Sequence, residues 1–218
     1  MKNKSIAVIA AFISTGCATV VADVWPQNVN GVMNMKHIAV SLDGTNVVAT
    51  PNLDDSPLEL LNFGESHNAP ADVLDGTAYN DQYGWIFEGF NVPSAGEAIW
   101  IEMESQTAGL ETYEGGMRPM KASHSYDAVF GTDGSPDIWR FDRVMTHNWY
   151  AVTAPGEYLA TYKVYVGDET TGAENSAYTP TSVTLTWTNV PEPTSAFLLA
   201  GGAIFTLGRR RSRSGANR

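Results

Sequence analysis

The chain of 218 residues carries a formal charge of −11, and 43% of its residues are hydrophobic, which is enough apolar material for one folded domain. All 24 acidic residues lie between Asp23 and Glu192, whereas that span holds only six basic residues and has a charge of −18. Such a charge disfavours binding to nucleic acid. The single cysteine, Cys17, leaves the rest of the chain without a disulfide, a cysteine-type zinc site or a cysteine nucleophile.

The N-terminus has the three parts of a secretory signal peptide, which are a basic start, an apolar stretch over 6–21 and a small residue, Ala22, for cleavage. We therefore predict a signal helix over 1–22 that is removed after Ala22 on export. The polar break at Ser14 argues against a retained membrane helix. A lipoprotein modified at Cys17 stays open as an alternative.

The span 23–189 consists of short apolar stretches separated by turns rich in Gly, Pro, Asn and Asp, the pattern of an all-β domain. Alternation is clearest near its end, where Val183, Leu185 and Trp187 share one face. We predict an antiparallel β-sandwich of the immunoglobulin-like or jelly-roll type. Strands are predicted at 37–42, 46–50, 85–90, 98–103, 128–130, 138–143, 158–166 and 183–188, with a short helix as the alternative at 58–61 and a long exposed hairpin loop at 167–176.

Enzyme motifs are lacking from this domain, which has no Gly-x-Ser-x-Gly elbow and no glycine-rich phosphate loop after a strand. Glu102 and Glu104 share one strand face, which permits glycosidase-like chemistry but is also ordinary on a solvated strand. We therefore predict that the protein is not an enzyme. Trp85 and Trp139, near predicted loops, are candidates for stacking on an extracellular polysaccharide, whereas Trp187 is predicted to lie in the core.

Metal ligands, if any, must be histidines and carboxylates, because the domain has no cysteine. The histidines are His37, His67, His124 and His147. None has the spacing of a local metal motif, so the favoured expectation is that each makes a hydrogen bond within the protein. Calcium is a second possibility, and its candidate ligands in glycine-containing loops are Asp72, Asp75, Asp81, Asp133 and Asp137.

The C-terminal tail, residues 190–218, has three parts in order. It begins with the sequence Val190, Pro191, Glu192 and Pro193. An apolar helix is predicted over 196–208, and an arginine cluster over 209–213 follows it, formed by Arg209, Arg210, Arg211 and Arg213. The prolines keep the junction extended and exposed. Arginines directly after an apolar run stay in the cytoplasm, which leaves the domain outside. We therefore predict a single C-terminal transmembrane helix.

This tail resembles the PEP-CTERM signal of Gram-negative bacteria that make extracellular polymer. The resemblance implies that an exosortase, a membrane cysteine protease, cuts at the motif and passes the protein to the surface. It implies nothing about the activity of the domain. A plain membrane anchor at the C-terminus is the alternative.

A second resemblance covers most of the domain. The stretch from Thr146 to Tyr158, which contains His147, is similar to the His-x-Asn-Trp and Pro-Gly-x-Tyr pattern of the surface-anchored domains called choice-of-anchor M. The strand that contains His37 and the stretch 98–110 are similar to further parts of that family. The resemblance implies a metal site that uses His37 and His147. Ala39, however, replaces the acidic residue of the family pattern, and the usual spaced histidine pair is missing.

Together these features predict an exported, exosortase-processed protein of the cell surface or extracellular matrix, with a non-catalytic structural or interaction role. One alternative is a metal-binding accessory protein that uses His37 and His147. A further alternative is a domain that binds or cleaves polysaccharide. The predicted partners are the exosortase, the membrane through the C-terminal helix, and an extracellular polysaccharide.

Overall fold

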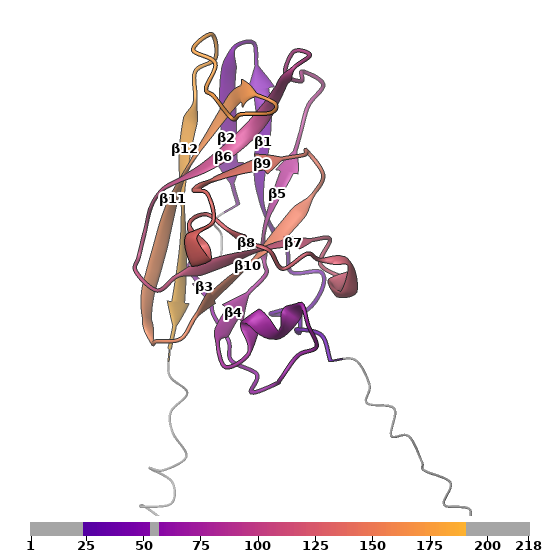
Figure 1. The fold of residues 1–218 in the computed structure, drawn as a ribbon, viewed down its shortest axis with the longest axis vertical. Helices are drawn as coiled ribbons and strands as arrows, with labels where there is room; N and C mark the ends of the chain where they lie inside the picture. The colour runs from indigo at the N-terminus through magenta and orange to yellow at the C-terminus, as the bar shows by residue number, and fades with distance from the viewer. Residues whose placement is uncertain (1–23, 53–56, 191–218) are drawn as a thin grey trace, which may run out of the picture.

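The computed structural model describes residues 24–52 and 57–190, which form two β-sheets packed face to face (Figure 1). The predicted signal helix and the predicted membrane helix over 196–208 lie outside the described residues. Within the described ranges, no helix is long and apolar enough to cross a membrane.

Strands make up most of the regular secondary structure of the described chain. They are β1 (Lys36–Asp43), β2 (Asn46–Pro51), β3 (Leu58–Glu59), β4 (Ala78–Asn80), β5 (Tyr83–Phe87), β6 (Glu97–Gln106), β7 (Glu111–Gly116), β8 (Ala128–Val129), β9 (Ile138–Phe141), β10 (Thr146–Val152), β11 (Gly156–Asp168) and β12 (Thr181–Asn189). Three short 3₁₀ helices lie in the connections, and they are η1 (Ala71–Leu74), η2 (Lys121–Ser123) and η3 (Thr132–Gly134).

The two sheets are mixed, so the prediction of a purely antiparallel sandwich is wrong. One sheet has the order β2-β1-β5-β10-β7-β8, with β4 also paired to β10, and the other has the order β3-β12-β11-β6-β9. The pairs β1–β5 and β12–β3 are parallel. Both pairs join strands far apart in the sequence, and a long connection lets the chain return in the same direction.

The core lies between the sheets and follows the period of two expected for half-buried strands. Val183, Leu185 and Trp187 of β12 are buried in it, as predicted. From the other sheet, Trp85 and Tyr150 contribute aromatic rings to the same cluster. The shared core explains how a domain without cysteine holds two sheets together.

A second apolar cluster covers the opposite face of the seven-stranded sheet. Trp149 and Ala151 of β10 belong to this cluster, whereas their neighbours Tyr150 and Val152 belong to the shared core. Segments 24–35, 62–77 and 117–127 lie over this face, and we call them the covering layer; they contribute Val29, Ala71, Leu74 and Tyr126. Strand β10 is therefore buried on both faces.

Several predicted bounds need correction. Residues 58–61 do not form a helix, because Leu58 and Glu59 form β3 and pair with Trp187 and Thr188 of β12. The strands predicted at 85–90, 128–130 and 138–143 end earlier, at Phe87, Val129 and Phe141. The predicted hairpin loop is present between β11 and β12, but its first two residues belong to β11.

Candidate functional site

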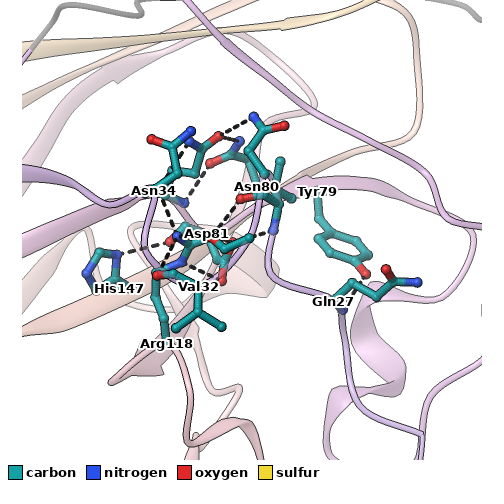
Figure 2. Close-up of polar contacts among 12 residues, drawn as sticks. Gln27, Val32, Asn34, Tyr79, Asn80, Asp81, Arg118 and His147 are labelled. Atoms are coloured by element: carbon teal, nitrogen blue, oxygen red, sulfur yellow. Dashed lines mark hydrogen bonds and ion pairs between the residues drawn. The ribbon is translucent and has the colours of Figure 1, made fainter.

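A buried ion cluster lies between the seven-stranded sheet and the covering layer. Figure 2 shows two of its members, Asp81 and Arg118. Asp81, in the turn between β4 and β5, accepts hydrogen bonds from Nε and Nη2 of Arg118 at 3.0 and 2.7 Å. Lys121 donates to the same carboxylate at 2.8 Å and lies 3.8 Å from the centre of the Trp149 ring. The cluster thus holds one anion and two cations away from water.

Arg118 also fixes the segment that precedes β1. Its side chain is fully buried, and its Nη atoms donate to the backbone carbonyls of Val29, Gly31 and Asn34 at 2.8 to 2.9 Å. One guanidinium therefore satisfies carbonyls that have no strand partner and ties residues 29–34 to the sheet. Asp81 completes this arrangement by accepting the backbone N–H of Val29.

The environment of the cluster lowers the pKa values of both Asp81 and Lys121. Burial alone would raise the pKa of Asp81, but the hydrogen bonds and charges of Arg118 and Lys121 outweigh it and lower this pKa. Burial lowers the pKa of Lys121 to about 8, although Asp81 opposes the shift. The arrangement thus keeps Asp81 ionised and weakens the proton affinity of Lys121.

His147, on β10, is oriented by the same turn. Its Nδ1 lies 3.0 Å from the backbone carbonyl of Asp81, and a carbonyl only accepts, so Nδ1 carries the proton. Nε2 therefore presents a lone pair, and it is buried with no hydrogen-bond partner in the protein. Burial lowers the pKa of His147 to about 4, which keeps the ring neutral at physiological pH.

The rings of His37 and His147 meet across a glycine. In the sheet, His37 of β1 pairs with Gly84 of β5, and Gly84 pairs in turn with His147 of β10. Register partners point to the same face, so both rings lie on the face away from the core. Their centroids are 5.5 Å apart with an interplanar angle of 62°. The Nε2 atom of His37 is also buried without a hydrogen-bond partner.

Gly84 is required by this arrangement for a steric reason. A Cβ atom at this position would lie 2.4 Å from Nε2 of His147 and 2.5 Å from its Cε1. The space left by the missing side chain is where the ring of His147 lies. A lone glycine inside a strand pattern often marks such a close approach, and this was the available sequence signal for the pair.

The other two histidines make hydrogen bonds within the protein. His124 accepts from the indole Nε1 of Trp149 at 3.1 Å and donates through Nε2 to the carbonyl of Met117 at 3.0 Å. His67 lies 2.9 Å from the carboxylate of Asp75 through Nδ1. The Nε2 atom of His67 is buried without a hydrogen-bond partner, like those of His37 and His147, but it lies 3.8 Å from the carboxylate of Glu65.

The predicted calcium ligands do not assemble in the described part of the chain. Asp81 belongs to the ion cluster, and Asp75 contacts His67. Within residues 24–52 and 57–190, no group of three or more His, Cys, Asp or Glu side chains is placed to hold a metal ion. A metal at the histidine pair would therefore take its remaining ligands from solvent or from a partner.

Exposed tryptophan at the predicted positions is contradicted by the structure. Trp85 is fully buried and Trp139 is 8% exposed, because both point into the shared core. Trp187 is buried, as predicted. Glu102 on the outer side of β6 contacts Lys163 at 3.2 Å, and Glu104 accepts from Ser182, so these carboxylates have ordinary surface partners.

Comparison with known families identifies the C-terminal part of the chain. The described residues form a β-rich domain whose last strand ends at Asn189, where a segment with the features of a sorting signal begins. Residues 189–212 match the family model of the PEP-CTERM protein-sorting motif. The chain therefore carries a PEP-CTERM sorting signal, as predicted, and this signal implies export, association with the surface and processing by exosortase, a membrane enzyme.

No curated protein and no solved structure matches the chain. The similarity to choice-of-anchor M domains stays a prediction. Most of the predicted sorting and cleavage residues lie outside the described residues; they are Ala22, Pro191, Glu192, Pro193, Arg209, Arg210, Arg211 and Arg213.

Proposed function

We propose that the exported domain is a non-catalytic binding module of the cell surface or matrix, and that its ligand is a transition-metal ion held by His37 and His147. The observation that carries this proposal is the pair of buried Nε2 atoms, each without a hydrogen-bond partner. Leaving a buried polar atom unpaired costs roughly 1–3 kcal/mol, so a site that holds two of them is suited to a ligand.

The geometry supports two imidazoles on one ion. With nitrogen–metal distances of about 2.0–2.1 Å, two rings that share a metal place their centroids about 5–6 Å apart. The observed separation is 5.5 Å. The Nδ1 proton of His147 is held by the carbonyl of Asp81, which is the arrangement that orients metal-binding histidines and raises their basicity.

The chemistry of the pair favours an ion that accepts imidazole nitrogen, such as copper, zinc or nickel. Calcium prefers oxygen ligands and does not suit the pair. Polysaccharide binding through Trp85 or Trp139 has no support, because both rings are buried.

Metal titration by calorimetry, with elemental mass spectrometry of the purified full-length protein, tests the proposal. We expect about one equivalent of copper, zinc or nickel in the wild-type protein and a loss of uptake in His37→Ala and in His147→Gln. His37 is only half-buried, so its replacement leaves the fold least disturbed. His124→Gln is the matched control, because both nitrogens of His124 already contact the protein.

Uptake that survives in both pair variants, or a folded wild-type protein that takes up none of the three metals, would contradict the metal assignment. Either result would leave a structural or interaction role at the surface as the function of the domain.

A further inference from the structure

The sorting motif begins inside the folded domain. Strand β12 ends at Asn189, which pairs with Gly156 of β11, and the PEP-CTERM match starts at the same residue. The side-chain amide of Asn189 donates to the carbonyl of Ala154 at 2.9 Å. The first residue of the signal is thus held by the sheet on one side and by the β10–β11 turn on the other.

Asn189 and Val190 also line a surface groove of about 330 Å³. The groove lies beside β3 and the end of β12, two strands that pair with each other (Figure 1). Leu61, Phe63 and Pro155 give the groove its apolar lining, and Asn62 and Thr153 add polar groups. Val190 is 60% exposed. The groove is thus open to a partner that approaches the sorting motif.

The few residues between Asn189 and the prolines of the motif limit the distance between the groove and an enzyme that binds the motif. Pro191 to Pro193 follow Asn189 by two to four residues, and an extended chain spans at most about 3.3–3.6 Å per residue. The motif therefore lies within about 7–14 Å of Asn189. A protease that takes the motif into its active site comes against the end of the domain at this distance.

We propose that this groove is a docking surface for the exosortase, so that the enzyme reads the folded end of the domain together with the motif. The inference rests on the processing function that the motif implies. The docking surface is inferred from the overlap of the groove with the sorting signal, because Asn189 and Val190 belong to both. The partner surface that fits combines hydrogen-bonding groups with apolar side chains, because Glu59, Asn62 and Thr153 line the groove beside Leu61, Phe63 and Pro155.

Processing of the full chain in a host that supplies the exosortase tests the proposal. Thr153→Arg places a large cation in the groove, and Thr153 is exposed and makes no side-chain hydrogen bond. We expect it to slow conversion of the full-length chain to the processed chain by about fivefold or more in a pulse–chase experiment. Ala122→Arg, an exposed position outside this groove, is the matched control and is expected to convert at the wild-type rate.

A second variant separates docking from simple access. An insertion between Val190 and Pro191 of eight Gly and Ser residues followed by a second copy of Asn189 and Val190 moves an intact motif away from the groove and leaves the groove residues in place. Docking predicts slower conversion, whereas faster or unchanged conversion would overturn the proposal. Acceleration by Thr153→Arg would also overturn it, because that result would mean that the groove holds the chain's own motif instead of the enzyme.

The motif variant Pro191→Ala distinguishes this inference from the processing function itself. If the wild-type chain is never converted, the processing function fails. If Pro191→Ala blocks conversion while Thr153→Arg and the insertion leave it unchanged, only the docking surface is wrong. Equal melting temperatures of the purified variants would show that a change in conversion does not come from unfolding.

Discussion

Replacement of Asp81 by Asn is expected to destabilise the domain more than any surface substitution. The side chains of Asp81, Arg118 and Lys121 are 1%, 0% and 9% exposed. Asparagine keeps the volume of the side chain and the backbone contact to His147, but it removes the only anion of the cluster. Two buried cations then lack a counter-charge.

The expected loss follows from this burial. Breaking a buried ion pair by removing one partner costs about 3–5 kcal/mol, because the remaining charge stays desolvated. For a domain of this size, a change of 1 kcal/mol shifts the melting temperature by roughly 2–4 °C, so the midpoint is expected to fall by about 6–20 °C. Lys121→Met in the Asp81→Asn background removes one cation and is expected to recover part of the loss.

Urea unfolding of the full-length protein at pH 7, followed by tryptophan fluorescence, measures this effect. Glu102→Gln is the control, because Glu102 and Lys163 form a surface pair with side chains 37% and 22% exposed, for which a loss of about 0–1 kcal/mol is expected. If Asp81→Asn costs no more than Glu102→Gln, the cluster is solvated and the reasoning is wrong.

Three further predictions concern Lys121, Gly84 and the tryptophans. The pKa of Lys121 is lowered to about 8, against about 10.4 in the unfolded chain, so the unfolded state binds more protons between these values. The free energy of unfolding should therefore rise from pH 8 to about pH 10 in wild-type protein and stay flatter in Lys121→Met. Gly84→Ala should displace the ring of His147, cost about 1–3 kcal/mol in thermal melts and abolish metal uptake; an unchanged melting temperature would contradict the steric argument. Acrylamide should quench native tryptophan fluorescence weakly, with most of the accessible fraction lost in Trp25→Phe, since Trp25 is only partly buried and the other five indoles are less than 9% exposed.

The sequence predicts best those strands that have water on one side. Val183, Leu185 and Trp187 alternate with threonines in β12, and the structure buries all three. Strand β10 has no such alternation, because its residues from His147 onward are buried on both faces, against the core and the covering layer. The pattern of residues 146–150 does not predict a strand, and only the resemblance to choice-of-anchor M domains singles them out. The two-residue strand β3 is too short for any periodic signal.

The contacts of the candidate site could not be predicted from local sequence patterns either, because they join residues far apart in the chain. His37 and His147 are 110 residues apart, and only the register of β1, β5 and β10 places their rings on either side of Gly84. The family resemblance named this pair, but local spacing gave no reason for the two rings to meet. Asp81 was predicted as a calcium ligand because it lies in a turn, whereas partners 37 and 40 residues away make it the centre of an ion cluster.

The position of β12 links completion of the fold to the start of the sorting signal. The strand contributes Trp187 to the shared core and pairs along its length with β11, so the fold is complete only when the chain up to Asn189 is in place. The sorting signal starts at that residue. A chain in which β12 is not paired therefore carries a sorting signal that no folded domain supports. Pairing of β12 thus determines both the completeness of the core and the structural context in which the sorting signal starts.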